Sequence, residues 1–202
     1  MGLTSVPDDE LATIVTTLEM DERPRPGPLP TSRLQLQRWP EPEPTRYRAL
    51  FKRVGERWLW FSRLAMDDAT LLPIIRNPKV EVYAVVNPAG VEIGMLELDF
   101  RRADAAELSY LGLVPELTGH GHGGWLMMQA LGLLWRPGVR RVSVNTCTLD
   151  HPAALGFYRR HGFRAVRRTV ETFIDPRAAG VLPPNAAPQI PMLASPPSCP
   201  TS

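Results

Sequence analysis

The sequence is poor in cysteine and lacks long apolar runs, and each shortage excludes a class of protein. Its two cysteines, Cys147 and Cys199, lie in a predicted strand and in a proline-rich end, so they form neither a disulfide framework nor a metal-ligand spacing. Residues 1–20 are acidic early and contain no long apolar run, which argues against a signal peptide and a membrane span. We therefore expect a soluble protein in a reducing, cytoplasmic setting, without a membrane partner.

The sequence also lacks a strong charge of either sign. Its 23 Lys and Arg residues and 21 Asp and Glu residues give a formal net charge of +2, which is too small to predict a nucleic-acid partner. A chain of 202 residues fits one domain whose core needs no disulfide or structural metal. We place this domain at 11–175, after a flexible stretch at 1–10. The many prolines and few large apolar residues of 176–202 predict a disordered tail.

Apolar periodicity and turn residues predict an alternation of strands and helices. Strands are expected at 11–20, 34–39, 80–86, 91–100, 106–114, 141–147 and 163–173, and helices at 46–54, 66–75, 123–135 and 151–161. The turn signal Asn87-Pro88-Ala89-Gly90 predicts that the third and fourth strands form an antiparallel hairpin. Thr45 is the predicted cap of the first helix, and Asp150 or His151 is the predicted cap of the last.

The segment Leu113–Gly124 (LVPELTGHGHGG) joins a predicted strand to a predicted helix. Its glycines allow tight turns and a close approach of the backbone to a ligand. Successive N–H groups, helped by the positive end of the following helix, can then point at one anion. This pattern favours a cradle for a phosphate or a diphosphate.

Two other interpretations of the glycine loop stay open. It can be a turn that binds nothing. Gly119, Gly121 and Gly124 also match the dinucleotide spacing G-x-G-x-x-G, with Asp150 at a loosely suitable distance downstream. Against a dinucleotide site, residues 115–118 separate the strand from the glycines, and the preceding strands form a hairpin instead of βαβ units. A Walker loop is excluded because no Gly-Lys-Ser/Thr follows.

The glycine loop resembles the acetyl-CoA loop of the GNAT acetyltransferases, which usually reads Val-x-Pro and then Arg/Gln-x-x-Gly-x-Gly/Ala. Leu113-Val114-Pro115 matches the first part, and Thr118, Gly121 and Gly123 stand in the second. Thr118 departs from the usual Arg or Gln. Because such a cradle works mainly through backbone N–H groups, we expect its function to survive that change.

A second motif downstream is similar to the family's Asn-x-x-Ala-x-x-x-Tyr-x-x-x-Gly-Phe. Ala154, Tyr158, Gly162 and Phe163 fit in place, and His151 stands where Asn is usual. One helix and one strand separate the two motifs, as in the family. The resemblance covers about 80–173 well, and the N-terminal part only by the order of its elements.

The resemblance implies an α/β (α+β) fold with a mixed, mostly antiparallel central sheet and helices on both faces. It implies acetyl-CoA as co-substrate, with the pantetheine arm on the backbone at Leu111 and Leu113, where two strands splay apart. The remaining implied contacts of the coenzyme are Thr118, Gly119, His120, Gly121, His122, Gly123, Gly124, Ala154 and Phe157. The partner would be an amine acceptor, and the protein a monomer or homodimer.

Amine acetylation needs a base for the attacking amine and a proton for the departing thiolate. The resemblance makes Tyr158 the acid that meets the sulfur, although a tyrosine at this place in a helix can also serve only packing. Glu107, on the strand that leads into the loop, is the first candidate base, and Glu97 on the preceding strand is its rival. Both glutamates can equally be solvent-facing strand residues.

The stretch 54–63 is rich in aromatic residues and lies where the family fold walls the acceptor site. Trp58 and Trp60 are therefore candidates to stack on an acceptor, and Glu56 to hold its ammonium group, with core packing as the alternative. His120 and His122 are two residues apart, but no carboxylate or cysteine is spaced to complete a metal site, so we expect no metal.

Taken together, the motifs and the resemblance that they carry predict a soluble N-acetyltransferase that moves an acetyl group from acetyl-CoA to an amine by direct attack on the thioester. A catalytically silent acyl-CoA-binding regulatory domain is the main alternative, since it would keep the glycine loop but need neither Tyr158 nor a carboxylate. A nucleotide-binding protein is a third.

Overall fold

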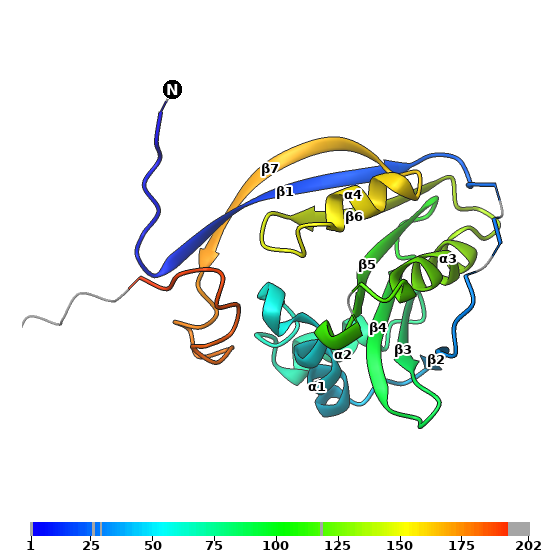
Figure 1. The fold of residues 1–202 in the computed structure, drawn as a ribbon, viewed down its shortest axis with the longest axis horizontal. Helices are drawn as coiled ribbons and strands as arrows, with labels where there is room; N and C mark the ends of the chain where they lie inside the picture. Colours follow the sequence, from blue (N-terminus) through cyan, green and yellow to red (C-terminus); the bar gives the residue numbers. More distant parts are fainter. Residues whose placement is uncertain (1, 26, 29, 118, 194–202) are drawn as a thin grey trace, which may run out of the picture.

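The computed structural model describes residues 2–25, 27–28, 30–117 and 119–193, and within them the chain forms one seven-stranded sheet with four α-helices (Figure 1). The sheet order is β2-β3-β4-β5-β6-β1-β7, and every neighbouring pair is antiparallel except β5 and β6. The strands are β1 (Glu10–Met20), β2 (Gln35–Trp39), β3 (Val80–Val86), β4 (Glu92–Asp99), β5 (Ala105–Leu113), β6 (Arg141–Cys147) and β7 (Arg164–Ile174). The predicted mixed, mostly antiparallel sheet is confirmed.

The helices are α1 (Pro44–Gly55), α2 (Asp68–Ile75), α3 (His122–Leu134) and α4 (Ala154–Arg160), with short 3₁₀ turns at Glu56–Trp58 and Pro115–Leu117. Figure 1 shows α1 and α3 on opposite sides of β4 and β5, and both helices contact these two strands. Most large buried side chains belong to this part of the molecule, because β3 and β4 are covered on both faces.

Two predicted helix caps were wrong. Glu43 caps α1, since its carboxylate accepts from the backbone N–H groups of Thr45 and Arg46 at 3.0 and 2.7 Å. Pro44 then takes the first helical position, where a missing N–H costs nothing. The last helix begins at Ala154, after Ala153 and without a side-chain cap. The Asp150 carboxylate bonds to Thr146 and Cys147 instead, and the His151 ring accepts from the Ala153 N–H, one residue before the helix.

The strands β5 and β6 pair only at their beginnings. Their parallel register joins Ala105–Leu108 to Arg141–Val144 and then stops. Beyond it, β5 continues along β4, while β6 continues along β1 as far as Cys147. The β4–β5 ladder also shifts register between Glu97 and Leu98, which bends β5 at this point. A wedge therefore opens between the two strands, in line with the splay that the resemblance implies.

The structure differs from the expected disordered tail over 176–193, which folds back onto the domain. Leu182, Ala186 and Ala187 are buried against Leu59, at 1–3% exposure for the three tail residues. The guanidinium of Arg177 is buried too. It donates to the Asp175 carboxylate at 2.7 Å and, through Nη1, to backbone carbonyls of the tail, that of Ile190 at 2.8 Å. Composition missed this packing because one leucine, two small alanines and a buried arginine hold a segment that contains few large apolar residues. Residues 194–202 lie outside the described part.

Candidate functional site

A cavity of about 870 Å³ fills the wedge between β5 and β6. This volume lies in the range of sites that hold cofactor-sized ligands. Side chains and backbone from β5, β6, β1 and β7, from the glycine loop, from α4 and from the segment 58–62 line it. The site is thus built at the place where the parallel pairing ends, and both sequence motifs contribute to it.

The glycine loop reaches the cavity with room for a ligand. Gly119 and Gly121 adopt left-handed backbone angles (φ 84° and 81°), and a Cβ at Gly119, Gly121 or Gly124 would meet no heavy atom within 4 Å. Gly121 is also the N-cap of α3, so the N-terminus of this helix lies beside the cavity. The Gly124 N–H bonds to the Gly121 carbonyl at 3.3 Å, which leaves those of His122 and Gly123 without a partner within the described residues. The arrangement fits a diphosphate. Thr118 lies outside the described residues.

The two histidines of the loop have different surroundings from its glycines. Among the described residues that line the cavity are Gly119, Gly121, Gly123 and Gly124, but neither His120 nor His122. The His122 ring lies 3.4 Å from the Ser32 hydroxyl. The His120 N–H bonds to the Leu117 carbonyl at 3.4 Å. The backbone contacts that the sequence suggested for the two histidines stay a prediction.

The backbone of β5 offers a free edge to the cavity. Leu111 and Leu113 pair with Leu96 and Gly94 of β4 on one side, whereas the pairing with β6 ends at Leu108. Both leucines line the cavity. An extended amide chain, such as a pantetheine arm, can pair with a strand edge of this kind.

Tyr158 lies on α4 and lines the cavity at 8% exposure. Its ring packs edge-on against Phe157 and Phe163. Within the described part of the chain its hydroxyl makes no hydrogen bond. Burial, and then the nearby Asp150 carboxylate, raise the pKa of the phenol above its ordinary value. The hydroxyl therefore stays protonated and is available to a ligand.

The two candidate carboxylates differ sharply in their surroundings. Glu97 is fully buried, accepts from the Tyr47 hydroxyl at 2.5 Å and pairs with Arg63 at 2.6 Å, and it is not among the residues that line the cavity. Glu107 lines the cavity, and its side chain makes no hydrogen bond or ion pair within the described residues. Burial, and then Asp99, raise the pKa of the Glu107 carboxyl. Glu107 is thus the candidate with access to a ligand.

Asp150 is a cavity residue that the sequence suggested as a helix cap and as the acid of the dinucleotide interpretation. Its carboxylate accepts from Thr146 Oγ1 at 2.7 Å, from the Cys147 N–H at 2.9 Å and from Trp60 Nε1 at 3.3 Å. It therefore links the end of β6 to the opposite wall. No sequence signal pointed to these three bonds.

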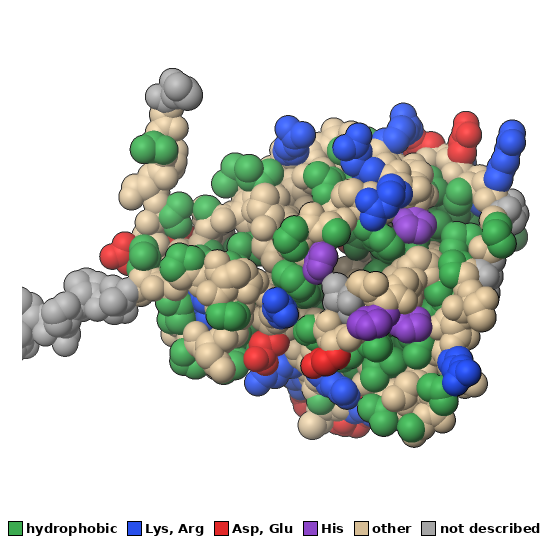
Figure 2. Space-filling model, viewed as in Figure 1, with side chains coloured by type: hydrophobic (Ala, Val, Ile, Leu, Met, Phe, Trp, Pro, Cys, Tyr) green, Lys and Arg blue, Asp and Glu red, His purple; other side chains and the backbone are tan. Residues whose placement is uncertain are grey.

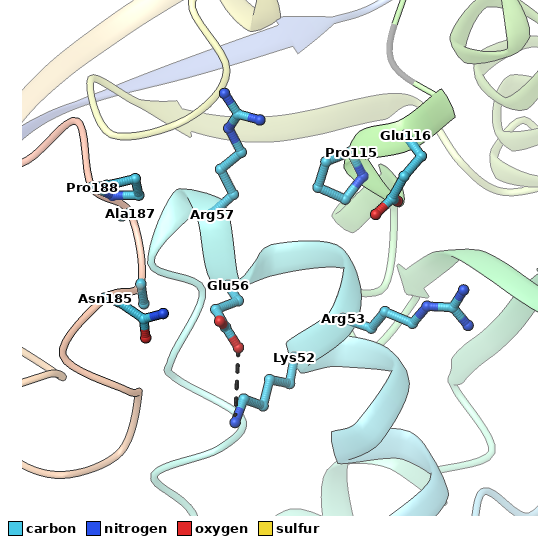
Figure 3. Close-up of a pocket in the computed structure, with 10 residues that line it drawn as sticks. Lys52, Arg53, Glu56, Arg57, Pro115, Glu116, Asn185, Ala187 and Pro188 are labelled. Atoms are coloured by element: carbon cyan, nitrogen blue, oxygen red, sulfur yellow. Dashed lines mark ion pairs between the residues drawn. The ribbon is translucent and has the colours of Figure 1, made fainter.

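The predicted acceptor residues divide between two cavities. Trp58 and Trp60 line the large one, beside Tyr110, whose hydroxyl lies 2.6 Å from that of Ser62. Glu56 instead pairs with Lys52 at 3.8 Å in a separate pocket of about 310 Å³. Figure 3 shows this pocket between the end of α1, the turn at Pro115 and the folded tail. Glu56 therefore does not line the large cavity, in which Trp58 and Trp60 lie.

Two residues of β7 line the large cavity without any sequence signal. Phe173 stacks on Phe61 of the aromatic stretch 54–63 with ring centroids 4.9 Å apart, and Glu171 lines the same cavity. Ala154 and Phe157 of α4 line the cavity as the resemblance implies. Phe173 and Glu171 could not be found from sequence because only the pairing of β7 with β1 brings them there.

Two kinds of feature, a metal-binding cluster and a membrane-spanning helix, are absent from the described residues. No three side chains of His, Cys, Asp or Glu lie close enough together to hold a metal ion. In the same part of the chain, no helix has both the length and the apolar character that a membrane span needs.

Comparison with solved structures identifies the fold. A GCN5-related N-acetyltransferase from Sphaerobacter thermophilus is 15% identical with a TM-score of 0.56, and the match covers 80% of this chain and 51% of that one. An aminoglycoside acetyltransferase from an uncultured soil metagenomic sample is 18% identical with a TM-score of 0.54, covering 69% and 93%. An IAA acetyltransferase from Bacillus cereus is 18% identical with a TM-score of 0.51, covering 66% and 79%.

The chain spans 51% to 63% of the length of the first three solved structures it matches. No curated protein sequence matches it. The model of the acetyltransferase (GNAT) family matches residues 31–163, which is more than half of the chain and includes the glycine loop and α4. This protein therefore belongs to the GNAT acetyltransferase family.

Proposed function

We propose that this protein transfers the acetyl group of acetyl-CoA to a primary amine of a small molecule or a protein. One observation carries the proposal. An open glycine loop at a helix N-terminus, a free strand edge, an unbonded phenol and an unbonded carboxylate all line a single cavity. A nucleotide site or a bare glycine turn would need only the first of these four features.

The residues divide the work by position. Backbone N–H groups of 119–124 would hold the diphosphate, and the β5 edge at Leu111 and Leu113 would hold the pantetheine arm. When bound, acetyl-CoA supplies an activated thioester. The thioester carbon would then lie between Glu107 on one wall and Tyr158 on the other, with the acceptor amine entering beside the aromatic residues.

Glu107 would act as the base. Its carboxylate takes a proton from the amine, directly or through one water molecule, while the nitrogen–carbon bond forms and the carbon–sulfur bond breaks. A raised pKa suits this role because it brings the carboxyl closer to the pKa of its proton donor. No further cofactor is needed for the balance of atoms and charge.

Tyr158 would stabilise the departing sulfur. A thiol has an ordinary pKa of about 8.5, below that of a phenol, so the phenol retains most of its proton and donates a strong hydrogen bond to the developing thiolate. Because the hydroxyl makes no hydrogen bond within the described residues, it is free for this contact. Asp150, which helps keep the phenol protonated, supports the same role.

Binding at the loop is tested by Gly124→Glu, with Gly132→Glu on the same helix as the matched control. Neither glycine has an atom within 4 Å of a new Cβ, and neither has a positive φ. Gly124→Glu should abolish acetyl-CoA binding in calorimetry, because its carboxylate would lie where the diphosphate belongs, and Gly132→Glu should bind normally. Equal binding by both variants would refute the placement.

Turnover separates the enzyme from the silent binding domain. Thiol release from acetyl-CoA is followed with a panel of primary amines, which includes an aminoglycoside because one structure of similar fold carries that name. Tyr158→Phe keeps the ring and should lower kcat by about ten- to a thousand-fold, with little change in coenzyme affinity. Binding without turnover for every amine would favour the regulatory domain, and tighter binding of NAD than of acetyl-CoA would favour the nucleotide site.

A further inference from the structure

The large cavity is lined by more negative than positive charge. Its carboxylates are Glu107, Asp150 and Glu171, and its only Lys or Arg among the described residues is Arg160. The loop Leu113–Gly124 contains no Lys or Arg either. For a ligand that carries several phosphate charges, the described lining therefore offers one guanidinium. The position of this guanidinium indicates which part of the ligand it can bind.

Arg160 stands at the end of α4, close to the beginning of α3. The contact between the two helices is made by Phe157, since a Cβ on Gly123 would lie 3.6 Å from its ring. Arg160 follows Phe157 by one helical turn and lines the same cavity as the loop glycines. The end of α4 thus brings a cation to the cavity that holds the N-terminus of α3.

The Arg160 side chain is free to reach a ligand. It runs back along its helix over Gly156, because a Cβ there would lie 3.3 Å from Arg160 Nη1. No carboxylate within the described residues lies within ion-pair distance of it, whereas Arg164 pairs with Asp21 and Arg177 with Asp175. In Figure 2, Lys and Arg side chains gather along the edge of this face where Figure 1 places α4 and β7.

We propose that Arg160 binds a phosphate group of the coenzyme and supplies the positive charge that the glycine loop lacks. The proposal rests on the function proposed above. The backbone N–H groups of the loop contribute partial charges and fix the orientation of the phosphates. The guanidinium adds a full charge and a forked donor that matches phosphate oxygens.

The chain offers a matched pair for the test. Arg159 and Arg160 are adjacent and exposed on the same short helix, but only Arg160 lines the cavity. Arg160→Gln and Arg159→Gln are compared by calorimetry with three probes: coenzyme A, dephospho-coenzyme A and pantetheine. Measurements at 0.15 M salt or above limit the long-range effect of either charge to about 8 Å.

Arg160→Gln should weaken coenzyme A binding by about ten- to a hundred-fold, the range for a lost hydrogen bond to a charged group. Arg159→Gln should bind like the wild type. Pantetheine carries no phosphate, so both variants should bind it equally. If Arg160→Gln also weakens the binding of dephospho-coenzyme A, the diphosphate is the partner of Arg160. If Arg160→Gln binds dephospho-coenzyme A like the wild type, the partner is the 3′-phosphate.

Two results would overturn the proposal. Equal affinity of the two variants for coenzyme A, when the wild type binds it, would remove Arg160 from the site and leave the proposed function intact. A wild type that does not bind coenzyme A would overturn both. Melting temperatures of the two variants, expected to agree because both side chains are exposed, show that a difference in affinity is local.

Discussion

The wedge divides the sheet into two halves, β2-β3-β4-β5 and β6-β1-β7, which differ in how far other elements cover them. β3 is buried at every residue and β4 nearly so, whereas β7 is exposed at almost every position. The family match at 31–163 contains the first half and ends before β7, and β1 lies before it. The first half therefore supplies most of the hydrophobic core, while β1 and β7 of the second half supply one wall of the cavity.

The buried ion pair of β4 should be the most sensitive point. Arg63→Met leaves Glu97 without its cation in a site where the carboxylate is fully buried, and we expect a loss of about 3–5 kcal/mol in the free energy of unfolding. Arg167→Met on exposed β7 is the matched control and should change it by less than about 0.5 kcal/mol. Urea unfolding measures both. Equal losses would mean that the two halves do not differ in the way their burial indicates.

The folded tail should rank second. Leu182→Ala removes a side chain that is 2% exposed and packs with Leu59, so we expect a loss of about 2–4 kcal/mol. Leu193→Ala, at 58% exposure, is the control and should be nearly neutral. A neutral Leu182→Ala would show that the tail adds little stability and would restore the expectation drawn from its composition.

The smallest effect on stability is expected at Glu107, with a defined dependence on pH. Its pKa is raised in the folded protein, so folding favours the protonated carboxyl and stability falls as pH rises through that pKa. Glu107→Gln removes this cost and should raise Tm slightly at pH 7, with no difference below about pH 4, where both states hold the proton. The same variant should lower kcat by about a hundred-fold or more. A lower Tm at pH 7 would mean that the carboxylate is stabilised by partners.

Much of the fold could be predicted because its signals are local. The turn at 87–90 and the period-two strands gave the β3–β4 hairpin and the β6 boundaries, and the glycine loop fell where α3 begins. The cap of α1 was misplaced because the helix begins earlier than expected, at Pro44, where Glu43 accepts from the N–H groups of Thr45 and Arg46. A glutamate is not the usual cap, so the residue types alone favoured Thr45.

The parts of the site that belong to a sequence motif could be predicted, whereas the parts that only tertiary pairing brings together were missed. Tyr158 and the glycines lie in one cavity, and their roles there stay predictions. Glu97 and Glu107 could not be separated from sequence, because both sit on strands with apolar neighbours. Their difference comes from Tyr47 and Arg63, which are far away in the chain and close only to Glu97.

The place of β1 between β6 and β7 also sets the order in which the molecule can assemble. Thr13 and Thr148, joined by a hydrogen bond, are separated by 135 positions in the chain. At a synthesis rate of about 5–20 residues per second, roughly 7 to 27 seconds pass between the synthesis of Thr13 and that of Thr148. Pairings of such long range also slow folding once the chain is complete. The strand that closes the wall of the cavity is therefore made first and paired last, and until then both of its edges are open to other chains.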